Sequence, residues 1–214
     1  MKVDSETEFM QGLIELQYGL DVVEKLQDVA GRVSWAVGWP KKKDAFWNAE
    51  AFMWKHKIDK EKRKFIIEEL AFLSGRNLDV GCGAFSYVDG SVGFDLSSKM
   101  LDFNEECSEK IVGDLEGELP FTSGSFDSVT AVFVLNYVED YVGLFSKVKR
   151  VLKDGGNFVM VLSSGKVNEW QRQKEVNSFC MGDWLSVLQG VGFNVNVKEK
   201  EGLWFFVCCK TKAY

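Results

Sequence analysis

The stretch "LDVGCGAFSYVDGSVGFDLSSKM", residues 78–100, decides the fold. It has the pattern of a short apolar strand, a turn with Gly81 and Gly83, a second apolar strand ending at Asp95, and the start of a helix. Only eleven residues, 81–91, separate the two strand runs. A crossover between parallel strands ordinarily takes about a dozen residues or more and usually holds a helix. The sequence therefore predicts that this helix is missing and that another element covers the exposed sheet face.

An apolar stripe near the N-terminus is the element that we expect to provide this cover. Apolar side chains recur there at helical spacing, and Ser5 with Glu8 has the spacing of a capping box. The pattern predicts one long helix, packed on the sheet face left bare between Gly83 and Ser91. A shallow loop that needs no cover is the alternative. The stripe consists of Phe9, Leu13, Leu16, Leu20, Val23, Leu26 and Ala30.

The pattern changes near Gly75, which divides the chain into an N-terminal helical segment, residues 1–75, and a second domain, residues 76–214. In the first part, Asp44 and Asp59 are placed to cap two more helices, with Gly75 as a stop. In the second, strands alternate with helices, which predicts a parallel sheet covered on both faces. The short turn before the last strand predicts an antiparallel hairpin. Strands are expected at 78–80, 92–95, 111–114, 128–135, 157–162, 193–198 and 203–210, and helices at 97–107, 137–152 and 183–190.

Composition limits the class of protein. The chain of 214 residues is 46% hydrophobic with a net charge of −6, which is typical of a globular protein with a real core. No apolar run reaches the roughly 18 residues of a membrane helix. The polar start does not resemble a secretory signal. The five cysteines show no CxxC spacing, which favours reduced thiols in the cytoplasm over disulfides or a metal site.

Three aspartates follow successive strand runs in the second part of the chain. Asp79, Asp95 and Asp114 stand at or near the ends of the first three predicted strands. In a doubly wound sheet, these ends line one crevice where ligands bind. Carboxylates can accept hydrogen bonds from ribose hydroxyls and amino groups, whereas they repel a pyrophosphate. The pattern therefore favours a positively charged nucleoside over a dinucleotide, with solvated strand ends as the alternative.

Four spaced motifs carry a resemblance to a known family. "LDVGCGAF", "VGFDLSSKML", "GDLEGELPFTSGSFDSVTAVFVLNYVED" and "RVLKDGGNFVMV" resemble the ordered motifs of class I S-adenosylmethionine-dependent methyltransferases. The closest group includes the ubiquinone and menaquinone biosynthesis methyltransferases, and the resemblance covers about residues 77–163. It implies a Rossmann-like α/β fold with a seven-stranded, mostly parallel sheet, an antiparallel C-terminal hairpin and, before it, an N-terminal helical lid.

The resemblance also implies roles for individual residues. S-adenosyl-L-methionine would be the cofactor, with Gly81 and Gly83 beside its methionine end and Asp95 on its ribose. The remaining cofactor-binding positions implied by the family are Asp79, Cys82, Leu96, Asp114 and Leu115. Asn136 and Tyr137 would orient the acceptor at the methyl-transfer site. The chain departs from the family pattern at Phe85, which replaces the third glycine and makes the loop bulkier.

The N-terminal segment leaves several roles open. His56, the only histidine, could be a base, but a solvated lid residue fits better. Trp35, Trp39, Trp47 and Trp54 could form an aromatic cage or ordinary packing. Residues 41–64 carry nine basic and four acidic residues, so this run could dock phosphate or nucleic acid or be a solvated surface.

Three function classes follow from these observations. We favour methyl transfer to a small molecule. The alternatives are an RNA or protein methyltransferase that uses the basic lid and a catalytically silent S-adenosylmethionine-binding protein. The acceptor and the oligomeric state cannot be predicted from these residues.

Overall fold

The computed structural model describes residues 4–165, 172 and 174–211, apart from the side chains at 55 and 56. Four helices come first: α1 (Ser5–Gln17), α2 (Val23–Ala30), α3 (Lys43–Lys57) and α4 (Lys60–Leu70). The strands are β1 (Asn77–Val80), β2 (Ser91–Asp95), β3 (Cys107–Val112), β4 (Phe126–Val132), β5 (Leu152–Ser163), β6 (Phe193–Lys200) and β7 (Leu203–Lys210). Between them lie α5 (Ser98–Phe103), the 3₁₀ turn η1 (Leu135–Tyr137), α6 (Tyr141–Val151) and α8 (Met181–Gly190).

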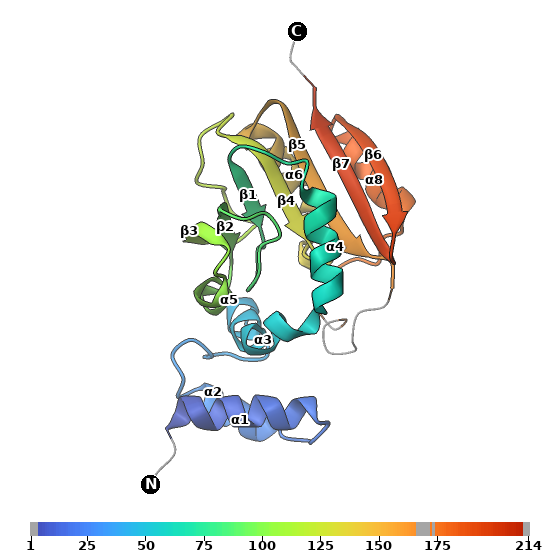
Figure 1. Ribbon diagram of the computed structural model, residues 1–214. Coiled ribbons are helices and arrows are strands. Elements are labelled where there is room, and N and C mark those ends of the chain that lie inside the picture. The colour runs from blue at the N-terminus through green and yellow to red at the C-terminus, as the bar shows by residue number, and fades with distance from the viewer. Residues whose placement is uncertain (1–3, 166–171, 173, 212–214) are drawn as a thin grey trace.

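The strands form one seven-stranded sheet in the order β3-β2-β1-β4-β5-β7-β6. The pairs among β1 to β5 are parallel, and β7 runs antiparallel to both β5 and β6. The sheet is therefore mostly parallel with an antiparallel C-terminal hairpin, as predicted (Figure 1). In such a sheet the carboxyl ends of the parallel strands meet at one edge.

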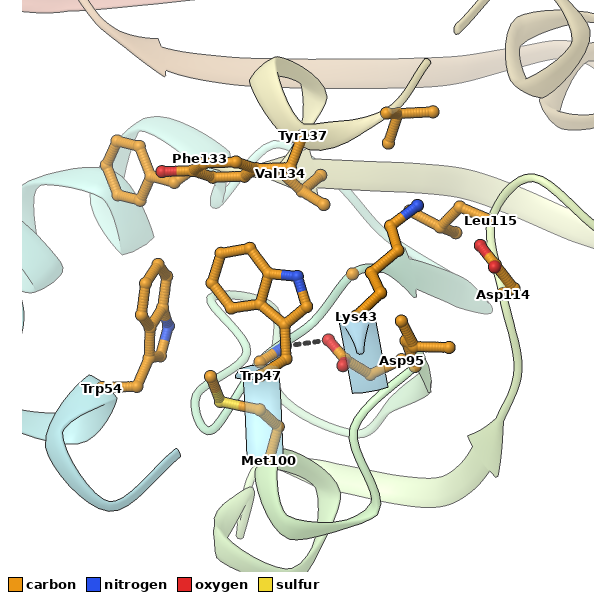
Figure 2. A pocket seen from close by; sticks show the side chains of 14 residues that line it. Lys43, Trp47, Trp54, Asp95, Met100, Asp114, Leu115, Phe133, Val134 and Tyr137 are labelled. Atoms are coloured by element: carbon orange, nitrogen blue, oxygen red, sulfur yellow. Dashed lines mark hydrogen bonds between the residues drawn. The ribbon is translucent and has the colours of Figure 1, made fainter. Parts of the chain in front are cut away.

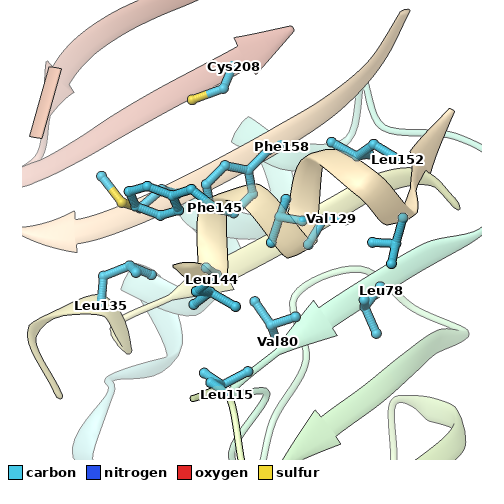
Figure 3. Close-up of a cluster of buried hydrophobic side chains, with 14 of the residues drawn as sticks. Leu78, Val80, Leu115, Val129, Leu135, Leu144, Phe145, Leu152, Phe158 and Cys208 are labelled. Atoms are coloured by element: carbon cyan, nitrogen blue, oxygen red, sulfur yellow. The ribbon is translucent and has the colours of Figure 1, made fainter. Parts of the chain in front are cut away.

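Side chains alternate between the two faces of the sheet, as the period of a strand requires. On β5, Phe158 and Met160 enter the larger core, which α6 and α8 cover with Phe145 and Trp184. Figure 3 shows Phe158 beside Phe145 in this core. Val159 on the same strand enters a second core on the opposite face. Both faces are thus buried, which explains the nearly continuous apolar runs of the central strands.

The helix after the glycine turn is missing, as predicted: residues 81–90 contain turns and bends only. The bare face is covered by α4, however, and not by the N-terminal helix. Ile66 and Leu70 of α4 pack with Val159 of β5 and Phe205 of β7, and Tyr87 of the short loop joins them. Figure 1 shows α4 lying across the middle of the sheet.

The prediction for the N-terminal helix was wrong in two ways. The apolar stripe forms two helices, because the chain turns at Gly19 with a φ of +81°. These helices pack on α3 rather than on the sheet, and Figure 1 shows them beyond α3. Their cluster, called here the N-terminal core, consists of Phe9, Leu26, Val29, Ala30, Val33, Ala36, Trp39, Ala45 and Ala49.

Several predicted helix boundaries were also wrong. Asp4 caps α1 by accepting a hydrogen bond from the Thr7 amide at 3.0 Å, so Ser5 is already helical. Asp44 lies in the first turn of α3 and does not cap it. Asp59 does cap α4, as predicted, at 2.8 Å from the Lys62 amide. Gly75 is not the stop, since α4 ends at Leu70.

Two boundaries near the predicted site were wrong as well. The third strand runs from Cys107 to Val112 and therefore ends before Asp114. Helix α5 ends at Phe103, before the predicted residue 107. The predicted helix over residues 137–152 is split into η1 and α6, and Asp140 caps α6 through the Gly143 amide at 2.9 Å.

Candidate cofactor and methyl-transfer site

The glycine turn after β1 exposes bare backbone at the carboxyl edge of the sheet. Gly81 and Gly83 have φ angles of +64° and +58°, a region that favours glycine. A side chain at Gly81 would clash with Val134, whose Cγ2 atom lies 2.3 Å from the position of an added Cβ. At Gly83 the neighbour is the Trp54 ring, with Nε1 at 2.9 Å. Both glycines are therefore required by close packing as well as by backbone conformation.

Asp95 at the end of β2 is held by backbone donors on both sides. Its Oδ2 accepts a hydrogen bond from the Gly83 amide at 2.9 Å, and its Oδ1 accepts one from the Ser97 amide at 2.8 Å. The side chain is buried, and this burial raises its pKa to about 6. A carboxylate has about four lone-pair sites. The Leu96 amide is a third backbone donor to this carboxylate, so about one site is left to accept a hydroxyl donor from a ligand.

The other two predicted aspartates differ in their position. Asp114 lines the same cavity as Asp95, and its Oδ1 accepts a hydrogen bond from the Glu116 amide at 3.0 Å. Asp79 is buried beneath the glycine turn and does not line the cavity. Its Oδ1 accepts a hydrogen bond from the Thr130 hydroxyl at 3.0 Å. Burial is the main cause that raises the pKa of Asp79 to about 7, and the charge of Asp95 adds to it.

A cavity of about 570 Å³, open to solvent, lies between these groups and α3 (Figure 2). Of the predicted cofactor residues, Gly81, Gly83, Asp95, Leu96, Asp114 and Leu115 line it. Its other lining residues are Lys43, Trp47, Trp54, Met100, Phe133, Val134, Tyr137 and Val138.

Helix α3 forms the roof of the cavity through two tryptophans on one face. Trp47 and Trp54 meet edge to face with their ring centroids 6.0 Å apart, and Trp47 lies 4.9 Å from the ring of Tyr137 (Figure 2). Between them, Ala51 packs with Ala84 and Met100. The helical spacing of these residues therefore serves packing and cavity lining together.

Two of the four tryptophans considered as a cage lie elsewhere. Trp39 belongs to the N-terminal core and contacts Phe9 at a centroid distance of 5.6 Å. Trp35 contacts Phe9 and Phe52, at 5.5 and 5.4 Å. The side chain of His56, at the end of α3, lies outside the described part of the chain.

The structure brings only one of the two predicted transfer residues to the cavity wall. Tyr137 lines the cavity, and burial raises the pKa of its phenol above the ordinary range. Asn136 does not line the cavity, because its amide turns to Glu175, with Nδ2 3.2 Å from the carboxylate.

The predictions for two loop residues differ from what the structure shows. The side chain of Cys82 turns away from the cavity and packs with Leu101 and Cys107. Phe85 does not bulk the cavity either, because it packs with Tyr87 in the core beneath α4. All five cysteines are free thiols.

Sequence reasoning missed five lining residues: Lys43, Met100, Phe133, Val134 and Val138. Phe133 follows β4 and has a φ of +58°, which is strained for a residue with a side chain. Such strain often marks a functional site. No local pattern reveals it, because the conformation is set by the strand end and by the hydrogen bond from the Phe133 amide to Val161, at 2.9 Å.

Comparisons with known proteins agree with the fold and the motifs. Residues 78–160 match the family model described as a methyltransferase domain. The chain is 36% identical over 118 residues to a demethylmenaquinone methyltransferase of Staphylococcus aureus, covering 48% of this chain and 49% of that protein. It therefore spans about half the length of this relative.

Solved structures show the same fold at low sequence identity. A methyltransferase-like protein from Bacillus halodurans aligns with a TM-score of 0.56 and 18% identity, covering 69% of this chain and 98% of its own. A SAM-dependent methyltransferase from Aquifex aeolicus aligns with a TM-score of 0.59 and 15% identity, covering 74% and 97%. With the matched domain, these results agree with the resemblance drawn from the four motifs: residues 78–160 are similar to a methyltransferase domain and to the quinone-biosynthesis group, and the chain shares the fold of the solved structures.

Proposed function

We propose that this protein transfers a methyl group from S-adenosylmethionine to a small-molecule acceptor. The observation that carries the proposal is the convergence of Gly83, Asp95 and Asp114 on one cavity roofed by the tryptophans of α3. A cationic nucleoside suits this cavity, because the carboxylates accept hydrogen bonds, the glycine turn exposes backbone and the walls are aromatic. A pyrophosphate would meet Asp95 and Asp114 in this cavity, whereas its lining cation, Lys43, is paired with Glu116.

The residues present fit such a cofactor. Asp95 keeps a lone-pair site for a ribose hydroxyl, and Asp114 with Leu115 lies where the family implies the adenine. The backbone of Gly81 and Gly83 lines the cavity where the family implies the methionine end. Asp79 contributes through the network beneath the turn, since its carboxylate is separated from the cavity by the chain itself.

The chain's own residues orient and shield the reacting groups. S-adenosylmethionine, when bound, supplies an activated methyl group. Tyr137 and the two tryptophans of α3 would hold the acceptor in line and exclude water. Positioning alone can contribute about 7–11 kcal/mol to well-oriented reactions. We propose Asn136 as a support for η1, since its side chain and carbonyl bind residues 175 and 176.

A small acceptor is favoured by the way the basic run is used. Lys42 pairs with Asp44 at 2.8 Å, Lys43 with Glu116 at 3.2 Å, and Lys57 with Glu50. These internal ion pairs compete with phosphate for the same charges. An RNA or protein methyltransferase, or a silent cofactor-binding protein, is the alternative. No helix in the described ranges is long and apolar enough to cross a membrane; a cytoplasmic location remains part of the proposal.

Calorimetry with S-adenosylhomocysteine tests whether the protein binds this cofactor. The Asp95→Ala variant tests whether the cofactor binds at Asp95. A hydrogen bond to a charged group contributes about 1.5–3 kcal/mol. The variant should therefore bind about 10- to 150-fold more weakly. Unchanged affinity would remove Asp95 from the site, and a preference for a nicotinamide dinucleotide would refute the proposal. Methyl transfer to RNA with a steep salt dependence would select the nucleic-acid alternative.

A further inference from the structure

One buried asparagine joins the roof helix to the strand end that carries Asp95. Asn48 of α3 is only 6% exposed. Its Oδ1 accepts hydrogen bonds from the Ser97 hydroxyl at 2.7 Å and from the Lys99 amide at 3.3 Å. Its Nδ2 donates to the carbonyl of Trp35 at 2.9 Å. The amide orientation is fixed, because one end faces a backbone donor and the other a backbone acceptor.

Ser97 passes this restraint on to Asp95. Its side chain is completely buried and caps α5 by accepting a hydrogen bond from the Met100 amide at 3.0 Å. The hydroxyl proton is therefore free to be donated to Asn48. The Ser97 amide donates to Asp95 Oδ1. The position of Ser97 thus sets one of the backbone donors that orient the carboxylate.

The hydrogen bonds of Asn48 connect two parts of the site that are distant in sequence. Helices α3 and α5 pack side by side (Figure 1). Trp47, next to Asn48, lines the cavity roof, and Asp95 lines its floor. Within the described side chains, Asn48 is the residue of α3 that hydrogen-bonds to the segment following β2.

We infer that Asn48 is a positioning residue: it holds Ser97 so that Asp95 presents its carboxylate to the ribose hydroxyls, and it thereby couples docking of the α3 roof to cofactor binding. This inference rests on the proposed function and on the ribose role proposed for Asp95. A coupling of this kind is reciprocal, so a bound ribose also favours the docked helix.

The test uses two ligands and measures discrimination rather than affinity alone. Calorimetry compares S-adenosylhomocysteine with its 2′-deoxyribose analogue in the intact protein and in Asn48→Ala. The intact protein should prefer the ribose form by about 10-fold or more, the effect of one hydrogen bond to a carboxylate. In Asn48→Ala, this preference should fall to about 2-fold, because the carboxylate loses its fixed orientation.

A destabilised control separates positioning from general loosening. Cys208→Ala removes a completely buried side chain from the larger core, far from the cavity lining, and should keep the preference. If Asn48→Ala does not fold, Ser97→Ala breaks the same link, together with the α5 cap, while leaving the backbone amide that Asp95 requires. Ser97→Ala should show the same loss of preference.

The outcomes are distinguishable. If Asn48→Ala weakens both ligands by the same factor, the residue is merely structural and the inference is overturned. If the intact protein binds the two ligands equally, the ribose role of Asp95 is wrong and the inference falls with it. If the intact protein binds neither ligand, the proposed function itself is refuted.

Discussion

Replacing Gly83 with alanine probes the closest approach between the roof helix and the glycine turn. The residue has a φ of +58°, and an added Cβ would lie 2.9 Å from Nε1 and 3.2 Å from Cδ1 of Trp54. Two penalties therefore act together. The left-handed backbone costs a residue with a Cβ about 1–2 kcal/mol. The tryptophan ring must also move, although the ring of Trp47 lies 6.0 Å away between centroids and Nζ of Lys57 lies 5.7 Å from its centroid.

Gly90→Ala is a matched control in the same loop. Its φ is +71°, and an added Cβ meets no atom within 4 Å. It carries the backbone penalty without the contact. For a chain of this size, a loss of 1–2 kcal/mol lowers the melting temperature by about 2–8 °C. Both variants should show this fall in melting temperature. Only Gly83→Ala should also weaken the binding of S-adenosylhomocysteine, by about 10-fold or more.

A double variant tests whether the additional loss of ligand affinity in Gly83→Ala comes from the contact with Trp54. Coupling between residues in contact is typically about 0.5–3 kcal/mol. Calorimetry and thermal melts should show that Trp54→Ala harms the Gly83→Ala protein less than it harms the native one. If Gly83→Ala binds the ligand as well as Gly90→Ala does, the roof does not reach the glycine turn and the reasoning is refuted.

Three further predictions follow from the site and the two smaller cores. Burial raises the pKa of Asp79 to about 7, above its unfolded value of about 3.9, so the folded state holds an extra proton between about pH 4 and 7. The free energy of unfolding should therefore fall as the pH rises through this window. In denaturant melts of Asp79→Asn, this free energy should depend less steeply on pH. Ile66→Ala should lower the free energy of unfolding by about 2–5 kcal/mol, whereas Phe9→Ala in the N-terminal core should mainly increase hydrogen exchange in α1 to α3. With an acceptor identified, His56→Ala should keep most activity and Trp47→Ala should lose far more; a loss beyond about 100-fold in the histidine variant would make His56 the base.

The sheet could be predicted from the sequence because its strands are short, apolar and punctuated by turns. The last strand was predicted at residues 203–210, as the structure has it. The missing crossover helix followed from a count of residues alone. Family motifs indicated the glycine turn and Asp95, and the structure brings six of the eight predicted cofactor residues to one cavity.

What could not be predicted is which apolar stripe covers which surface. The apolar stripes of α1 and α4 both have helical periodicity. This periodicity does not indicate which surface of the protein each stripe will pack against. The same holds for the cavity. Lys43 and Met100 come from helices on either side of it, and only the packing of α3 on α5 brings them together. Cys82 was misplaced because a turn residue can direct its backbone and its side chain to opposite sides.

The short loop after β1 connects the fold to the site. Because it contains no helix, the face that such a helix would cover is free to receive α4. Helix α4 begins at Lys60, and α3 ends at Lys57, so docking of α4 on the sheet also fixes where α3 ends. Trp54 lies one turn before that end and against Gly83. The absence of a helix from the crossover thus leaves the sheet face to α4, and α4 in turn places the aromatic side chains of α3 over the cavity. This links the eleven-residue spacing in the sequence to the roof of the proposed cofactor site.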